Sequence, residues 1–74
     1  MRGEHLAAGE HKTVHGCGGM TLIYCGAGEV NVTAGGESVA LIADEAARFD
    51  GYAGEIELCS QSGARLMLAK AEAV

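Results

Sequence analysis

The segment around Gly35-Gly36 constrains the fold of this 74-residue chain more than any other feature. Apolar and polar side chains alternate over residues 29–34, which places Val30 and Val32 on one face of a strand. Residues 37–43 follow as a second strand-forming run. Two-residue hairpin loops require positive φ, which glycine adopts without steric cost. The segment therefore predicts two antiparallel strands joined by a tight turn, as in a β-meander.

Glycine and small polar residues divide most of the remaining chain into similar short runs. The 12 glycines fall at the breaks, which disfavours helix and favours short strands. The predicted strands cover residues 12–17, 20–25, 29–34, 37–43, 46–50, 55–60 and 64–70. A short helix over 43–48 is an alternative for one run, because its alanines and Arg48 have good helix propensity. About seven antiparallel strands at this spacing are typical of an all-β barrel or sandwich.

The length of the chain predicts a single domain, residues 1–74, with little stability of its own. A core of this size contributes a net of about 3–5 kcal/mol. Apolar residues make up 49% of the chain, yet only Tyr24, Phe49 and Tyr52 are aromatic. Small aliphatic side chains must therefore form the core, and we expect a homo-oligomer, a dimer or larger, to cover some of the apolar surface. Residues 1–10 lack a stable period and are expected to be irregular.

The charge balance excludes two classes of partner. Ten acidic residues face five scattered basic ones, for a formal charge of −5. Nucleic acids and anionic membrane surfaces both require a basic patch, so we expect neither as a partner. No run approaches the roughly 18 apolar residues of a membrane span, and the first residues lack the apolar core of a signal peptide. The three cysteines are expected to be reduced thiols of a cytoplasmic protein.

Residues 28–41, Gly-Glu-Val-x-Val-x-x-Gly-Gly-Glu-x-x-x-Leu, resemble the middle of a cupin barrel. In cupins a strand, a tight turn and a second strand lead into a Leu-x-x-Gly-Asp corner, which here reads Leu-Ile-Ala-Asp-Glu at 41–45. Asp44 replaces the glycine of that corner, and aspartate tolerates left-handed backbone better than most residues. Residues 63–68 resemble the closing strand. The most specific match is the C-terminal half of HutD/Ves-like cupins, and the resemblance covers about residues 20–70.

The resemblance implies a small cupin-like (jelly-roll) barrel or sandwich without the usual cupin metal. Metal-dependent cupins carry a His-x-His pair on the strand before residue 28, where this chain has Leu22, Ile23 and Tyr24. HutD/Ves-like proteins are more than twice as long, which implies that a second subunit completes or covers the fold. We therefore expect a non-enzymatic small-molecule-binding protein with no cofactor and no catalytic residue. The alternatives are a structural or interaction protein that acts through its oligomer interface, and a metal-dependent enzyme that uses N-terminal His and Cys side chains.

Three aromatic residues are the candidate ligand-binding side chains. Tyr24 lies in the most continuously apolar run, and its hydroxyl needs a partner if it is buried. Phe49 and Tyr52 flank a turn, where they could cover a barrel mouth or an interface. The sequence therefore predicts a ligand site around Tyr24, Phe49 and Tyr52.

The metal-site alternative uses His15, Cys17 and His11, because imidazole and thiolate are good zinc ligands. On a strand, His15 and Cys17 project from the same face about 7 Å apart. His11 would lie about 13 Å from His15, too far for the two to share one metal ion. Surface histidines near the start of the domain are the simpler interpretation of the same residues.

Overall fold

The computed structural model describes residues 2–71, which form seven antiparallel strands and no helix. The all-β fold predicted from the glycine spacing is therefore confirmed. The strands are β1 (Arg2–Leu6), β2 (His11–His15), β3 (Met20–Ala34), β4 (Glu37–Ile42), β5 (Glu45–Asp50), β6 (Glu55–Cys59) and β7 (Ala64–Ala71).

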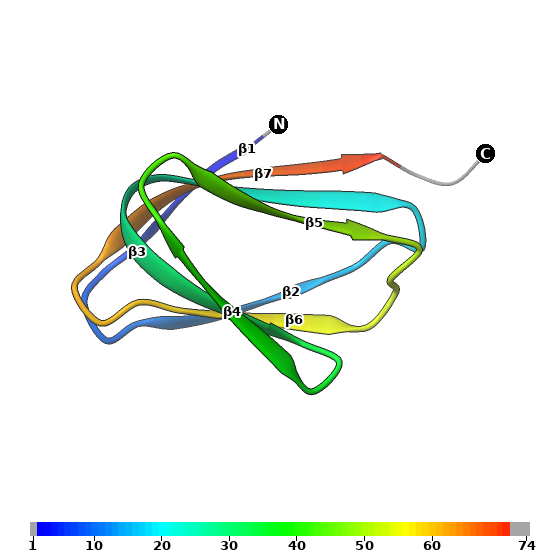
Figure 1. Ribbon diagram of the computed structural model, residues 1–74, viewed down its shortest axis with the longest axis horizontal. Coiled ribbons are helices and arrows are strands. Elements are labelled where there is room, and N and C mark those ends of the chain that lie inside the picture. Colours follow the sequence, from blue (N-terminus) through cyan, green and yellow to red (C-terminus); the bar gives the residue numbers. More distant parts are fainter. Residues whose placement is uncertain (1, 72–74) are drawn as a thin grey trace.

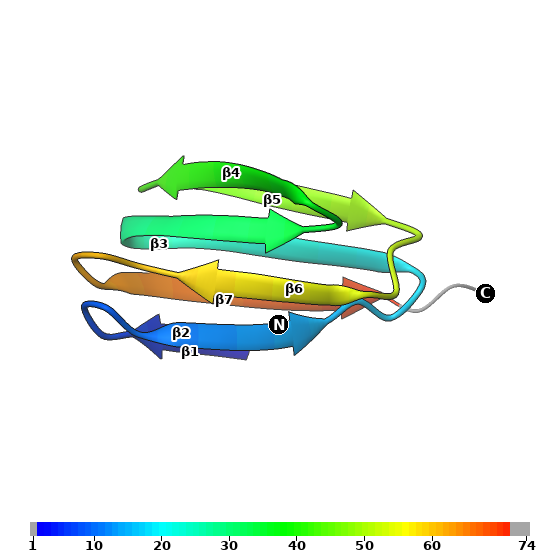
Figure 2. The same ribbon diagram turned by 90° about the horizontal axis from the view of Figure 1, so that it is seen from below.

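Strand β3 is 15 residues long and belongs to two facing sheets, which curl around it into a half-barrel (Figure 1). Its first half pairs with β7 on one edge and β5 on the other, which gives sheet A the order β1-β7-β3-β5. Its second half pairs with β6 and β4, which gives sheet B the order β2-β6-β3-β4. Figure 2 shows the two layers one behind the other, with β4 and β5 along one long side and β1 and β2 along the opposite side.

The bend of β3 corrects one prediction from the sequence. The glycines at 26 and 28 were expected to turn the chain between two separate strands, yet the strand continues through them. A β-bulge between Cys25 and Ala27 shifts the register against β7, and such bulges bend a strand sharply. Gly28 has φ +78°, and a Cβ at this position would collide with the carbonyl oxygen of Gly63. Glycine at 28 therefore lets the bent strand and the β6–β7 loop approach closely.

The prediction for the N-terminal segment is also wrong, whereas the strand predicted over 46–50 is confirmed against its helix alternative. The segment 1–10, expected to be irregular, contains β1, which pairs with β7 over its full length. Leu6, which is fully buried, is the single large apolar residue of this strand. The sequence of β1 therefore lacks the alternation of apolar and polar residues that would predict a strand. The helix alternative over 43–48 is replaced by β5.

The predicted turn at Gly35-Gly36 and the predicted corner at Asp44, in contrast, match the structure. Gly35 and Gly36 both have positive φ, 59° and 81°, and join β3 to β4 in a two-residue loop. Asp44 is the one described non-glycine residue with positive φ, 71°, at the corner between β4 and β5. Its backbone N–H donates to the carbonyl oxygen of Cys25, which holds this corner on β3.

Aliphatic side chains fill the space between the two sheets. The buried apolar residues are Leu6, Val14, Ile23, Cys25, Val30, Val32, Leu41, Ile56, Leu58, Ala64, Leu66 and Leu68. Two buried polar residues accompany them. The Ser60 hydroxyl donates to the Glu29 carbonyl oxygen, whereas the Thr21 hydroxyl has no hydrogen-bond partner. These buried side chains form the core of the half-barrel.

The two long sides of the sandwich differ in character. On the charged side, β1 and β2 turn Glu4 and Lys12 toward the interior, where Lys12 Nζ lies 2.6 Å from Glu4 Oε2. On the apolar side, β4 and β5 present only uncharged residues at the equivalent central positions. These residues are Val39, Leu41, Ala47 and Phe49, and Ile42 lies at the end of β4.

Candidate binding pocket at the bend of the sandwich

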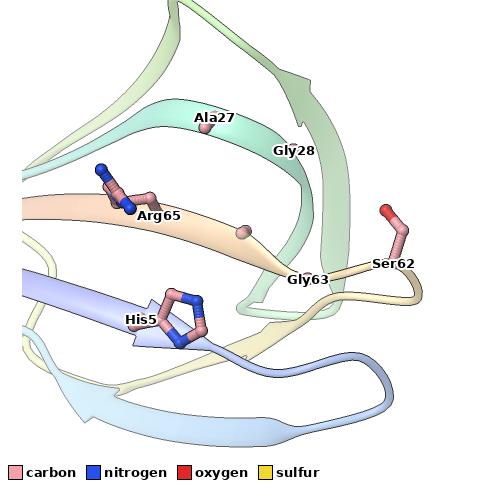
Figure 3. A pocket seen from close by; sticks show the side chains of 7 residues that line it. His5, Ala27, Gly28, Ser62, Gly63 and Arg65 are labelled. Carbon is pink, nitrogen blue, oxygen red and sulfur yellow. The ribbon is translucent and has the colours of Figure 1, made fainter.

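An open pocket of about 220 Å³ lies where β3 bends, on the outer surface of sheet A (Figure 3). Three parts of the chain build it: the bulge of β3, the loop between β6 and β7, and the end of β1. The lining residues are His5, Ala27, Gly28, Ser62, Gly63, Ala64 and Arg65. The pocket therefore lies at the register shift of β3, where the bulge side of the strand meets the β6–β7 loop and the end of β1.

An imidazole and a guanidinium are the ionisable side chains that line this pocket. His5 and Arg65 are directly opposite each other in the β1–β7 register, and both are exposed. No ion pair joins the Arg65 guanidinium to an acidic residue within the described chain, and none of the lining residues is acidic. The pocket thus offers an anion the charged donors of Arg65, with no carboxylate in its lining.

Glu29 fixes the loop that forms the rim of the pocket. Its Oε1 atom accepts hydrogen bonds from the backbone N–H groups of Gln61 (2.8 Å) and Ser62 (2.9 Å) and from the Ser62 hydroxyl (3.0 Å). The Ser60 hydroxyl also lies 3.1 Å from this oxygen. These bonds, the Ser62 N–H foremost, lower the pKa of the Glu29 carboxyl, while desolvation opposes them. Glu29 thus borders the pocket with its negative charge directed to the loop.

Tyr24 lies on the outer face of sheet A, outside the pocket. Its hydroxyl donates to Asp44 Oδ1 at 2.6 Å, which raises the pKa of Tyr24 because the bond is made by the protonated hydroxyl. Burial and the negative charge of Asp44 raise it further. The hydroxyl that was expected to need a partner therefore has one, and the contact ties the β4–β5 corner to β3.

Phe49, near the end of β5, and Tyr52, in the turn between β5 and β6, come together, and neither lines the pocket. Their ring centroids are 5.9 Å apart, with the planes tilted by 41°. Both rings are partly buried against the core, and the Tyr52 hydroxyl donates to the Glu55 carbonyl oxygen at 2.8 Å. The structure therefore groups two of the three predicted ligand-binding residues and places Tyr24 apart from them.

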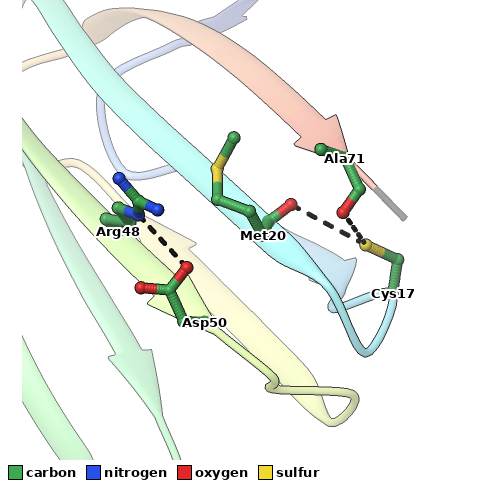
Figure 4. Close-up of polar contacts among 5 residues, drawn as sticks. All are labelled: Cys17, Met20, Arg48, Asp50 and Ala71. Atoms are coloured by element: carbon green, nitrogen blue, oxygen red, sulfur yellow. Dashed lines mark hydrogen bonds and ion pairs between the residues drawn. The ribbon is translucent and has the colours of Figure 1, made fainter. Parts of the chain in front are cut away.

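The residues of the metal alternative are also spread out. His11 and His15 stand on the exposed face of β2, and His15 Nε2 lies 3.8 Å from Glu55 Oε1. Cys17 follows the strand, and its thiol lies near the carbonyl oxygens of Met20 (3.8 Å) and Ala71 (3.7 Å) (Figure 4). Across residues 2–71, no three His, Cys, Asp or Glu side chains are placed to hold a metal ion.

His5 and Arg65 were not predicted as site residues. They lie near opposite ends of the chain, and the antiparallel pairing of β1 with β7 brings them together. The sequence carries no local motif for either residue. A correct strand assignment for residues 2–6 would have been the signal, since the β1–β7 register then places the imidazole and the guanidinium side by side.

Comparison with known proteins adds no family assignment. No protein-family model matches the sequence, and no curated protein matches it either. Within the described residues, no helix is long and apolar enough to cross a membrane. The chemistry of the pocket is therefore the basis for assigning a function.

Proposed function

We propose that this chain is a non-enzymatic small-molecule-binding protein of cupin-like, jelly-roll type that binds a small anion between His5 and Arg65. One observation carries the proposal. His5 and Arg65 are cross-strand neighbours that line one pocket of about 220 Å³ with no acidic lining residue. In a chain with a formal charge of −5, such a place is the natural one for a negative ligand.

The side chains define the chemistry of the ligand. The guanidinium of Arg65 offers donors in a planar fork, which matches the geometry of a carboxylate or phosphate group. A protonated His5 adds a second charge-assisted donor. Typical ligand pockets begin at about 300 Å³, so this smaller pocket suits a compact anion rather than a nucleotide-sized one.

Calorimetric titration tests this proposal, with inorganic phosphate and acetate as probes and acetamide as the uncharged control. We expect binding at millimolar concentrations, on the order of −4 kcal/mol, for the anions alone. Arg65→Gln removes a charge-assisted hydrogen bond and should weaken binding roughly tenfold or more. Arg48→Gln is the matched control, because Arg48 is exposed on β5 but already paired with Asp50 at 3.1 Å (Figure 4).

The results of these titrations distinguish a specific anion site from a general effect of charge. Equal binding of acetamide and acetate would contradict an anion site. If Arg65→Gln and Arg48→Gln weakened anion binding equally, the affinity would depend only on the net charge of the chain. A tighter complex below neutral pH that disappears in His5→Gln would support the role of His5.

A second function, self-association, is favoured by the apolar side of the sandwich. Val39 faces the interior of sheet B yet remains 45% exposed, and Ile42 on the same strand is 60% exposed. Both lie on β4, whose outer edge pairs with no other strand of residues 2–71. We propose a second copy of this chain as the occupant, which would cover these side chains and extend a sheet in the manner of strand addition.

Sedimentation velocity at micromolar concentrations tests this second function. The wild-type chain should sediment as a dimer or larger, and Val39→Lys should shift it toward the monomer because an ammonium group would enter the interface. Lys70→Ala, which changes an exposed residue near the end of β7, is the control for altered charge. A monomeric wild-type chain would exclude self-association through this side.

A further inference from the structure

The exposed face of sheet B contains a thiol next to an imidazole. Cys59 on β6 is directly opposite His11 on β2, and its other neighbour across the sheet is Asn31 on β3. Cys59 Sγ lies 3.8 Å from His11 Nε2, within reach of a hydrogen bond to sulfur. The pair is partly open to solvent, since Cys59 is half-buried and His11 is exposed.

The other two cysteines have different surroundings. Cys25 is fully buried, and its thiol faces the carbonyl oxygens of Ala27 and Gly28. Burial, the largest influence, raises the pKa of Cys25. Cys17 faces two carbonyl oxygens as well. A carbonyl oxygen accepts a hydrogen bond but does not remove the proton at neutral pH, whereas a neutral imidazole can take it.

We propose that Cys59 is a modification site that adds to α,β-unsaturated carbonyl compounds, with His11 as the proton acceptor. The neutral His11 ring, with its own proton on Nδ1, takes the thiol proton on Nε2. The sulfur lone pair then forms a bond to the β-carbon of the electrophile, and the carbon–carbon π pair moves toward the carbonyl as an enolate. The proton on His11 returns to the α-carbon, so the addition needs no leaving group and no redox partner.

N-Ethylmaleimide is a suitable probe, because it reacts by this addition and mass spectrometry reports each cysteine separately. We expect Cys59 to be labelled at least about tenfold faster than Cys17 in the folded chain, and Cys25 to be slower still. His11→Gln keeps a side chain of similar reach without the base, and should slow labelling of Cys59 about tenfold while Cys17 keeps its rate.

His15→Gln is the matched control, because His15 stands on the same face of β2 but is paired with Glu55. It should leave the Cys59 rate unchanged. Wild-type labelling of Cys59 in His11→Gln would overturn the proposal, as would equal rates at Cys17 and Cys59. The Cys17 and Cys25 rates in each variant report whether the fold is intact, so a loss of structure cannot be mistaken for a loss of the base.

Discussion

The charged side and the apolar side of the sandwich occupy equivalent places but leave their edge strands in different states. On the charged side, Glu4 and Lys12 point inward and pair with each other at 2.6 Å. Inward-pointing charges on edge strands are a common means of preventing unwanted strand pairing. On the apolar side, Val39 occupies an inward position without any charge and is left 45% exposed. The first side is therefore protected against strand pairing, and the second is the side to which we assign the proposed self-association.

The same comparison separates binding from assembly. His5 belongs to β1, so the anion pocket includes a residue of the charged side, and none of its lining residues belongs to β4 or β5. Val39 and Ile42 are not among the lining residues. Substitutions on one side should therefore change one property and leave the other intact, which the following experiments exploit.

The largest effect on stability is expected from a glycine substitution at the bend of β3, compared with one in the turn that leads into β4 on the apolar side. Gly28 and Gly36 have similar positive φ, 78° and 81°, but a Cβ at 28 would strike the Gly63 backbone whereas a Cβ at 36 meets no atom within 4 Å. Gly28→Ala should lower the free energy of unfolding by about 3 kcal/mol or more, and Gly36→Ala by about 1 kcal/mol. Urea denaturation measures both, and equal losses would show that the close approach at the bend is not a constraint.

Removing the inward charges should make the charged side behave like the apolar side. In the double variant Glu4→Gln/Lys12→Met, replacement of an ion pair by uncharged groups is expected to be close to neutral for stability. Self-association should become at least about tenfold tighter, or extend to larger species, because the second edge loses its protection. Sedimentation velocity of this variant and of the wild type measures the change. An unaltered distribution of sedimentation coefficients would show that the inward charges do not protect this side from self-association.

A smaller effect is expected from Thr21, which pairs with Phe49 beside the apolar side. Its buried hydroxyl has no partner, so Thr21→Val should raise the free energy of unfolding by about 1 kcal/mol. Thr33→Val is the control, because Thr33 Oγ1 lies 2.9 Å from Ser38 Oγ and its loss should cost about 0.5 kcal/mol. A destabilised Thr21→Val variant would mean that the hydroxyl has a partner in solution.

The smallest effect concerns the pocket loop and its dependence on pH. Hydrogen bonds lower the pKa of Glu29 in the folded chain below its ordinary value of 4.5. Its contribution is therefore complete above that value and disappears as the pH falls through the folded-state pKa. The stability difference between wild type and Glu29→Gln should shrink on acidification below about pH 4.5. A difference that stays constant down to pH 2 would show that the carboxylate does not hold the loop.

Local patterns predicted the hairpins, and long-range pairings were missed. The turn at Gly35-Gly36 and the left-handed Asp44 corner follow from backbone preferences that neighbouring residues alone decide. The continuity of β3 through its glycines does not, because it depends on the β6–β7 loop packing against Gly28. The glycines at 26 and 28 therefore allow β3 to bend, whereas the sequence suggested that the strand ends there.

The candidate site was hidden for the same reason. The residues around His5 do not alternate between apolar and polar, so the sequence does not predict a strand there. His5 becomes a candidate site residue only because β1 pairs with β7 and places it opposite Arg65. The aromatic residues attracted attention because their chemistry is visible in the sequence. In the fold, Tyr24 bonds to Asp44, and Tyr52 bonds to the backbone of Glu55. The polar groups of both tyrosines therefore have partners within the chain.

The central claim, an anion site between His5 and Arg65, is tested most directly by an NMR titration of the ¹⁵N-labelled chain with inorganic phosphate. The backbone amides of Ala27, Gly28 and Gly63 and the His5 ring should shift together and saturate at millimolar phosphate. In Arg65→Gln the same signals should need about tenfold more phosphate to reach half of their full shift. Shifts that are absent from these residues, or that persist unchanged in Arg65→Gln, would contradict the account.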